Sequence, residues 1–214
     1  MSTGAANAEA TWDGHAARYP AQEWLEARAI SAALRIADPG PEDRLVDLAT
    51  GTGAVLRALA GRRRRPATAV GVDRSASMLS RVGPLPEGWR TLRSEACHVP
   101  LPDGETDVVT CSYMLQLLAM NERGWVLREA RRLLGRTPRA RLVVVTPWAD
   151  RGTPGGRLVH GGLRGLARAR PGSWGGLMPL DPTAELEAAG LAPTHRILLP
   201  PGGYPSLVIR ARPA

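Results

Sequence analysis

The chain has 214 residues, of which 43% are hydrophobic and 22% charged, and this is ordinary for a globular fold with one well-buried core or two small ones. It has only 2 cysteines, and no apolar run approaches the roughly 20 residues that cross a bilayer, so a disulfide scaffold and a membrane span are excluded. The formal net charge is +8. The first residues lack the charged and apolar regions of a secretory signal, and we expect a cytoplasmic protein.

The basic charge raises nucleic acid as a partner. All 28 cations are arginine, however, and alanine, glycine and proline abound, which indicates a compositional bias. The densest run, Arg62 to Arg65, lies between Gly61 and Pro66, as is typical of a solvated turn; an anion contact is the alternative. Because no aromatic residues accompany this run, we do not expect a nucleic-acid partner.

Strand and helix patterns alternate along the chain. Apolar residues at helical spacing predict a first helix over 20–37, which the segment 38–41 ends. Further strands are predicted at 45–48, 69–73, 89–93, 107–112 and 141–146, and helices at 54–60, 75–81 and 122–134, the last capped by Asn121 and Gly135. This alternation predicts an α/β fold with a mostly parallel sheet and helices on both faces.

The C-terminal third departs from this alternation. Residues 147–180 are rich in glycine, arginine and proline, which suits a lid over a substrate. A helix then opens at Asp181-Pro182 and ends at Gly190, and the runs 191–199 and 204–211 are close enough to form an antiparallel hairpin. We expect one domain, with 1–40 as a covering segment and helix and 41–214 as the core.

A glycine turn carries the first chemical signal. The strand that ends at Asp47 and Leu48 runs into Ala-Thr-Gly51-Thr-Gly53 and then a helix. Free backbone N–H groups and the positive end of the helix dipole meet there, and glycine lets a ligand approach the main chain. Twenty residues beyond Gly53, a second strand ends in Asp73, placed to accept two ribose hydroxyls. Together these features predict an adenosine-containing cofactor.

The residues around the turn discriminate between cofactors. A dinucleotide site prefers a third glycine, but Leu56 occupies that position. Asp47, four residues before Gly51, can instead serve the α-amino group of an amino-acid tail, directly or through water. A carboxylate there favours S-adenosylmethionine, which carries an ammonium and a sulfonium, and disfavours a pyrophosphate.

The chain resembles the class I S-adenosylmethionine-dependent methyltransferases, and in particular the small-molecule enzymes related to the quinone-biosynthesis methyltransferases. The matching segments are DLATGTG at 47–53, GVDRSASML at 71–79, EACHVPLPDGETDVVTCSYMLQLL at 95–118, and REARRLL at 128–134 followed by RLVVVTP. They occur in the family order over about residues 42–147. The resemblance implies a Rossmann-like, seven-stranded sheet whose last strand is antiparallel.

The resemblance also implies roles for individual residues. The methionine end would lie on Asp47 and the glycine turn, the ribose on Asp73, and the adenine between Arg74, Met78 and the Glu95–Ala96 pair. Residues 111–113 would border the sulfonium and the substrate, and Gln116 stands where many relatives have histidine. The full cofactor set is Asp47, Ala49, Gly51, Thr52, Gly53, Asp73, Arg74, Met78, Glu95, Ala96, Cys111, Ser112, Tyr113 and Gln116.

Other residues are candidates for the substrate side. Trp12 and Tyr19 in the leading segment could close over the cofactor, with plain docking of the first helix as the alternative. His15 and His160 could act as general base toward a substrate, since imidazole titrates near pH 6.5. The four histidines and the cysteines show no ligand spacing, so we expect no metal. The N-terminal signature of quinone methyltransferases is absent, and a quinone substrate is not implied.

The leading hypothesis is transfer of a methyl group from S-adenosylmethionine to an oxygen, nitrogen or carbon atom of a small molecule, in secondary metabolism. An RNA or DNA methyltransferase is one alternative, but Cys-Ser-Tyr-Met after the fourth strand lacks the Asn-Pro-Pro-Tyr type of motif that holds a flipped base. A non-methylating reaction such as cyclisation, or binding alone, is the other. We expect no membrane partner, and the sequence leaves the oligomeric state open.

Overall fold

A seven-stranded sheet forms the centre of the protein. The computed structural model describes residues 19–148, 152, 154–169, 178–200 and 204–214, and its strand order is β3-β2-β1-β4-β5-β7-β6. The strands are β1 (Arg44–Leu48), β2 (Thr68–Asp73), β3 (Trp89–Arg93), β4 (Val108–Ser112), β5 (Arg141–Pro147), β6 (Leu191–Leu199) and β7 (Ser206–Pro213). Neighbouring strands from β3 to β5 are parallel, and β7 is antiparallel to both β5 and β6. The predicted α/β architecture with an antiparallel last strand is confirmed.

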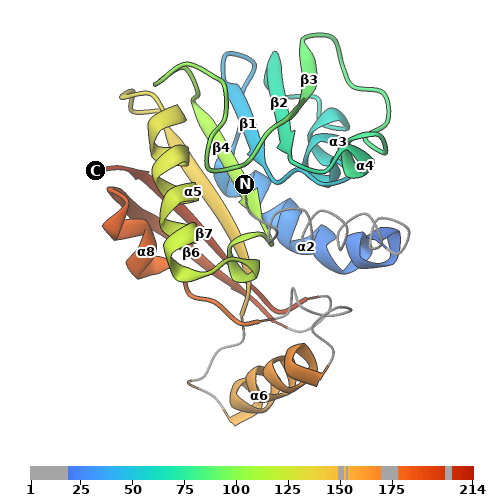
Figure 1. Ribbon diagram of the computed structural model, residues 1–214, viewed down its shortest axis with the longest axis vertical. Helices are drawn as coiled ribbons and strands as arrows, with labels where there is room; N and C mark the ends of the chain where they lie inside the picture. The colour runs from blue at the N-terminus through green and yellow to red at the C-terminus, as the bar shows by residue number, and fades with distance from the viewer. Residues whose placement is uncertain (1–18, 149–151, 153, 170–177, 201–203) are drawn as a thin grey trace, which may run out of the picture.

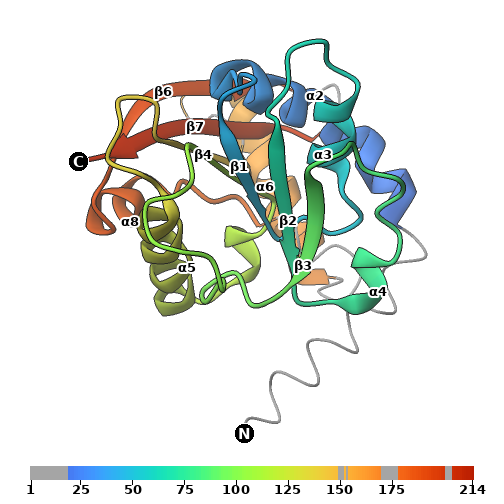
Figure 2. The same cartoon turned by 90° about the horizontal axis from the view of Figure 1, so that it is seen from above.

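Helices cover both faces of this sheet (Figure 2). On one face lie α2 (Tyr19–Ala37) and α3 (Ala54–Ala60), and on the other α5 (Met120–Leu133) and α8 (Thr183–Ala188). Short turns, α4 (Ala76–Leu79) and η1 (Leu115–Leu117), follow β2 and β4. A further helix, α6 (Pro154–Ala169), lies beyond the carboxyl ends of the strands (Figure 1).

The alternation of side chains along the strands divides the interior into two cores. In β5, Leu142 and Val144 belong to the core under α5, whereas Val143 and Val145 belong to the core under α2. Successive strand side chains point to opposite faces, so a continuous apolar run is what a strand covered on both faces requires. All seven residues of β5 are buried, in agreement with this requirement.

Several element bounds differ from the structure by one or two residues, among them β7, predicted at 204–211, and three larger differences concern helices. The helix expected at 122–134 begins at Met120, because the Glu122 carboxylate accepts the Ala119 N–H at 2.8 Å and so starts the helix upstream of Asn121. The helix expected at 75–81 is only Ala76–Leu79, with the Ser75 hydroxyl accepting the Met78 N–H. The segment 147–180 contains helix α6, which its glycines concealed.

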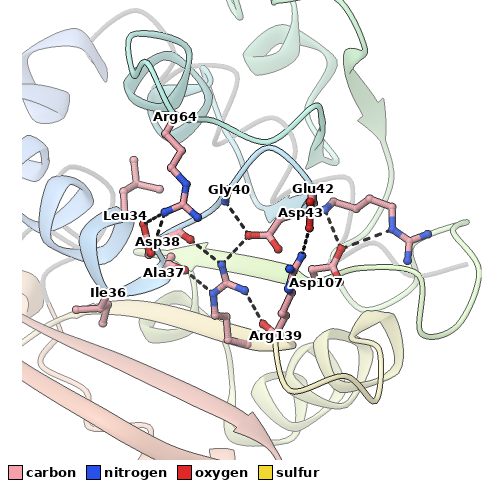
Figure 3. A network of polar contacts seen from close by, with 12 residues as sticks. Leu34, Ile36, Ala37, Asp38, Gly40, Glu42, Asp43, Arg64, Asp107 and Arg139 are labelled. Atoms are coloured by element: carbon pink, nitrogen blue, oxygen red, sulfur yellow. Dashed lines mark hydrogen bonds and ion pairs between the residues drawn. The ribbon is translucent and has the colours of Figure 1, made fainter.

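A buried ion pair fastens α2 to the amino edge of the sheet (Figure 3). Arg141, at the start of β5, pairs with Asp43 at 2.8 Å, and both side chains are nearly inaccessible. The Arg141 guanidinium also donates to the carbonyls of Ala37 and Asp38, which end α2. Cations are favourable at a helix carboxyl end, so this clasp uses the helix dipole as well as the carboxylate.

An open pocket of about 400 Å³ lies over this clasp. Its charged side chains form three pairs, Arg141 with Asp43, Arg139 with Glu42, and Arg64 with Asp38. Because each of these guanidinium groups already has a carboxylate, we assign the pocket a structural role and no ligand.

Candidate functional site

The predicted cofactor residues gather at the carboxyl edge of the sheet, opposite the clasp. In a parallel sheet the carboxyl ends of neighbouring strands meet at one edge, and ligands of such folds bind there. Asp47 lies in β1, Asp73 ends β2, the Glu95–Ala96 pair follows β3, and Cys111 lies near the end of β4. These four strands are adjacent in the sheet (Figure 1). The fold therefore brings together segments that are far apart in sequence.

Asp47 is a buried carboxylate that is only partly satisfied. Its Oδ1 accepts a hydrogen bond from the Thr110 hydroxyl at 2.7 Å, across the β1–β4 pairing. Its Oδ2 is shielded from solvent and has no hydrogen-bond partner within the described part of the chain. An unpaired buried charge costs several kcal/mol unless a cation compensates it, so this oxygen points to a cationic ligand.

Burial raises the pKa of Asp47 from its ordinary value of 3.8 to about 6, although the Thr110 hydrogen bond acts in the opposite direction. The carboxyl is therefore ionised at neutral pH without a charged partner of its own. A positive group near it would restore the ordinary preference for the charged form. This electrostatic state fits the amino group of S-adenosylmethionine and does not fit a pyrophosphate.

The turn after β1 has a backbone that favours residues without side chains. Gly51 and Gly53 have φ of 55° and 84°, in the left-handed region, and Ala49 shares that region with φ of 55°. The left-handed conformation suits glycine and is costly for alanine. Thr52, between the two glycines, is also buried. A chain bent in this way presents its main chain where a ligand can approach it.

A glycine in β2 lets this turn lie directly against the strand. A Cβ on Gly71 would be 2.8 Å from Leu56 Cδ1 and 2.9 Å from both Thr50 Cγ2 and Thr50 Oγ1. The Thr50 N–H donates to the carbonyl of Val72, which fixes the close approach. The position of the cofactor turn thus depends on a residue that the sequence analysis did not select.

Asp73 connects the glycine turn to the end of β2. Its Oδ2 accepts the Gly51 N–H at 2.8 Å and its Oδ1 accepts the Ser75 N–H at 2.9 Å. Burial raises the pKa of Asp73, while these two backbone N–H groups and the nearby Arg74 lower it. A carboxylate has about four acceptor positions, so both oxygens keep the capacity to accept ribose hydroxyls.

The residues assigned to the adenine surround the ends of β2 and β3. Met78 is buried in α4, and Ala96 is buried after β3. The Arg74 guanidinium lies 3.9 Å from the Glu95 carboxylate, and both side chains are partly exposed. This contact between the two segments agrees with their predicted role on one ligand, although their contact with adenine stays a prediction.

The segment after β4 is held by several polar contacts. Tyr113 has a φ of 54°, and its phenol donates to the Ser206 hydroxyl at 2.7 Å, which itself donates to the Tyr204 carbonyl. The Gln116 amide donates to the Tyr113 carbonyl at 2.7 Å. Gln116 and the Tyr113 phenol therefore support the turn, and their contact with the cofactor stays a prediction.

Cys111 and Ser112 occupy the end of β4. Burial raises the pKa of the Cys111 thiol to about 12, with a further contribution from Asp47. A thiol that stays protonated is a poor nucleophile. Cys111 therefore acts as a small apolar side chain of the core. Ser112 is half-buried beside it. Cys97, by contrast, is exposed, and neither thiol forms a disulfide.

The substrate-side candidates are only partly described. His15 and Trp12 lie outside the described residues, as does the side chain of Tyr19 at the start of α2. His160 is buried in α6, with its ring edge-on to Trp148 at 5.5 Å. Trp148 directly follows β5, so His160 anchors α6 near the carboxyl edge, and a catalytic role for it stays a prediction. Among the described residues, no group of three histidine, cysteine or acidic side chains could hold a metal ion.

Sequence reasoning missed three residues that organise this site. Thr110 bonds Asp47, Gly71 admits the turn, and Ser206 holds Tyr113. Thr110 could have been found, since it is a hydroxyl residue within the otherwise apolar run Val-Val-Thr-Cys. Gly71 and Ser206 carry no such local signal, because their partners lie far away in sequence.

Comparison with known proteins agrees with this geometry. Residues 46–138 match a family described as "Methyltransferase domain". No curated protein sequence matches the chain. Residues 46–138 are thus similar to a methyltransferase domain, in agreement with the expected use of S-adenosylmethionine as cofactor.

Solved structures share the fold over nearly the whole chain. A putative methyltransferase from Haloferax volcanii, solved in complex with the Trm112 activator, has a TM-score of 0.67 and 16% identity, covering 94% of each chain. A possible histamine N-methyltransferase from Thermotoga maritima has a TM-score of 0.66 and 18% identity, covering 95% of this chain and 98% of that one. Magnesium protoporphyrin IX methyltransferase from Synechocystis PCC 6803, with bound S-adenosylhomocysteine, has a TM-score of 0.63 and 18% identity, covering 89% and 84%. At such identities the likeness concerns the fold alone.

Proposed function

We propose that the protein transfers the methyl group of S-adenosylmethionine to an oxygen, nitrogen or carbon nucleophile of a small molecule, as a cytoplasmic enzyme of secondary metabolism. The observation that carries the proposal is the buried, partly unsatisfied carboxylate of Asp47 beside a glycine turn. Its oxygen fits the cationic amino group of the cofactor. The acceptor side follows from the residues after β4.

The residues of the chain would bind the cofactor and orient it toward the methyl acceptor. Asp47 would bind the amino group, Asp73 the ribose hydroxyls, and the turn at Gly51 the main body of the ligand. When bound, S-adenosylmethionine supplies an electrophilic methyl group for in-line displacement. Alignment of the reacting atoms alone contributes roughly 7 to 11 kcal/mol, so an elaborate set of catalytic side chains is not required.

The geometry of Tyr113 favours a small acceptor over a flipped nucleobase. An enzyme that acts on a flipped base stacks it against aromatic or apolar side chains. The Tyr113 phenol is buried, donates to Ser206 and meets the Tyr204 ring edge-on at 6.0 Å. The Tyr113 ring packs in the interior and is not free to stack on a flipped base. This supports the small-molecule proposal against the RNA or DNA alternative.

Titration calorimetry with S-adenosylhomocysteine tests the cofactor half of the proposal. Binding is expected for the intact protein, and absence of binding at millimolar ligand would contradict the proposal. Binding of NAD in its place would do the same. The Asp47→Asn variant provides a matched control, since it removes the charge and keeps the size of the side chain.

The acceptor half needs a labelled methyl donor and a panel of phenols, amines and polyketides. Label in a small acceptor, with stoichiometric S-adenosylhomocysteine, supports the proposal. Conversion of an acceptor without cofactor turnover favours the alternative of cyclisation. Label in RNA or DNA favours the nucleic-acid alternative. Genomic neighbours and cell fractionation test the assignment to secondary metabolism and to the cytoplasm.

A further inference from the structure

Helix α6 carries one sign of charge only. Its 16 residues, PGGRLVHGGLRGLARA, contain three arginines and no acidic residue. Arg157, Arg164 and Arg168 are seven and four residues apart, so they fall within about 40° of one another around the helix. They form a single basic stripe, and we refer to these three residues by that name below.

The basic stripe faces outward without acidic partners at its far end. Arg157 and Arg168 are exposed and Arg164 is half-buried. Within the described residues, no carboxylate forms an ion pair with Arg164 or Arg168. Leu158, about one quarter-turn from Arg157, has 79% of its surface exposed. Exposed cations beside an exposed apolar side chain are the pattern of an interfacial helix.

The position of α6 suits contact with an extended surface. The helix follows β5 at the carboxyl edge and lies outside the layers that cover the sheet (Figure 1). Its described anchor is the edge-on contact of His160 with Trp148. Met120, which begins α5 after β4, has 74% of its surface exposed.

The composition of α6 gives a reason why it needs a surface. Five of its 16 residues are glycine, and each glycine in a helix interior weakens the helix relative to alanine. Most helices gain their stability from packing of an apolar face, but α6 stands apart from the helices that pack on the sheet. A surface that contacts Arg164 and Arg168 and takes up Leu158 would stabilise this helix.

We propose that α6 is an interfacial helix that binds the surface of an anionic phospholipid bilayer. The basic stripe contacts the lipid phosphates and carboxylates, and Leu158 enters the boundary between headgroups and acyl chains. A nucleic-acid backbone would contact the arginines but leave Leu158 exposed, whereas a bilayer accepts both kinds of side chain. This inference goes beyond the proposed methyl transfer and does not depend on it.

Flotation of the full chain with lipid vesicles tests the proposal. We expect binding to phosphatidylcholine vesicles that contain about one third phosphatidylserine, and little binding to phosphatidylcholine alone. Each arginine near an anionic surface contributes about fivefold in binding. The triple variant R157Q/R164Q/R168Q is therefore expected to lose about a hundredfold, and binding is expected to weaken with added salt.

A second triple variant, R63Q/R90Q/R136Q, is the matched control. These exposed arginines lie near the amino ends of the strands, far from α6, and their loss changes the net charge by the same amount. The control is expected to bind anionic vesicles like the unmodified chain. Leu158→Ser should lower binding at a salt concentration that already screens the arginines.

Three results would overturn the proposal. They are equal binding to the two kinds of vesicle, equal losses in the two triple variants, and binding of the basic stripe to duplex RNA or to an acidic polypeptide in preference to vesicles. Affinity for S-adenosylhomocysteine, measured on every variant, shows that the fold and cofactor site are intact. Failure of vesicle binding with retained cofactor affinity would therefore refute this inference and leave the proposed function standing.

Discussion

Two buried carboxylates near the ends of one strand have opposite environments. Asp43, just before β1, accepts from Arg141 at 2.8 Å and from the Gly40 N–H at 2.8 Å. Asp47, four residues later, accepts from the Thr110 hydroxyl and has no cationic partner within the described part of the chain, where its second oxygen is left without a hydrogen bond. Within the described residues, the chain thus supplies a cation to Asp43 and none to Asp47.

This difference distinguishes a buried carboxylate with a structural role, Asp43, from one that is suited to bind a ligand, Asp47. A buried ion pair that is fully hydrogen-bonded positions the elements it joins, and removal of one partner is strongly destabilising. A buried carboxylate without a cation weakens the free protein and gains its partner from a ligand.

The largest expected effect comes from breaking the clasp at the amino edge. Asp43→Ala leaves the Arg141 guanidinium buried without its carboxylate, and we expect a loss of about 3 to 5 kcal/mol in the free energy of unfolding. Urea denaturation measures this loss. Affinity for S-adenosylhomocysteine should stay the same in the folded protein, because the proposed cofactor site lies at the opposite edge.

The neighbouring Glu42 provides the control for this variant. Glu42 pairs with Arg139 at 2.6 Å, but both side chains are largely exposed. Exposed pairs contribute about 0 to 1 kcal/mol, so Glu42→Ala should have little effect on stability. Equal losses for Asp43→Ala and Glu42→Ala would contradict the structural role of the buried pair.

Asp47→Asn should show the opposite pattern from Asp43→Ala. Loss of a contact with a charged group costs about 1.5 to 3 kcal/mol, and we expect affinity for S-adenosylhomocysteine to fall by about tenfold to a hundredfold. The free protein should become more stable at neutral pH, because the rise in the pKa of Asp47 to about 6 corresponds to roughly 3 kcal/mol of unfavourable burial. Calorimetry and urea denaturation measure the two effects. A variant that loses stability and keeps affinity would place Asp47 with Asp43 as a structural acid.

The pH dependence of binding provides a further comparison of the two acids. Above about pH 6 Asp47 is ionised in the free protein, and below that pH it binds a proton that a cationic ligand must displace. Affinity for S-adenosylhomocysteine should therefore fall by about tenfold per pH unit from pH 6 toward pH 4. Calorimetry across this range measures the slope, and Asp47→Asn should abolish it.

The stability of the free protein should respond in the other direction. The folded-state pKa of Asp47 lies above its ordinary value of 3.8, so the folded state binds more protons than the unfolded state between about pH 4 and 6. Its contribution to stability is thus present below pH 4 and is lost as the pH rises through 6. The difference between the unmodified chain and Asp47→Asn isolates this contribution from that of other acids. A difference that does not change with pH would contradict the raised pKa.

Local patterns predicted most of the fold. The bounds of α3, β3 and β6 agree with the sequence, because glycine and proline residues punctuate apolar runs of the right length and period. Helix α6 was missed because five glycines mask its periodicity. The start of α5 was misplaced because Asn121 was expected to cap the helix. In the structure, the hydrogen bond between the Glu122 carboxylate and the Ala119 N–H sets the start.

The site was predictable in its location and less so in its contacts. Parallel strands bring Asp47 and Asp73 to one edge, which the alternation of strands and helices already implies. The contacts that tune them join residues far apart in sequence, 22 residues for Gly51 with Asp73 and 63 for Thr110 with Asp47. Residue type and spacing do not predict such pairings. The unpaired oxygen of Asp47 could therefore be found only in the structure.

The smallest expected effect concerns the strain at the carboxyl edge. Ala49 has a φ of 55°, which costs an alanine about 1 to 2 kcal/mol, while glycine adds about 0.4 to 1 kcal/mol of entropy to the unfolded chain. Ala49→Gly should therefore stabilise the protein by about 0.5 to 1 kcal/mol in urea denaturation.

A substitution of glycine by alanine in β2, at Gly71, tests the effect of added side-chain volume beside the turn. Gly71→Ala would bring a Cβ to 2.8 Å from Leu56 and 2.9 Å from Thr50, and because Leu56 is fully buried it has little freedom to move. Overpacking of this kind costs about 1 to 3 kcal/mol and should displace the turn, so Gly71→Ala should lower both stability and cofactor affinity. If Ala49→Gly lowered stability instead, the alanine would contribute contacts worth more than its strain.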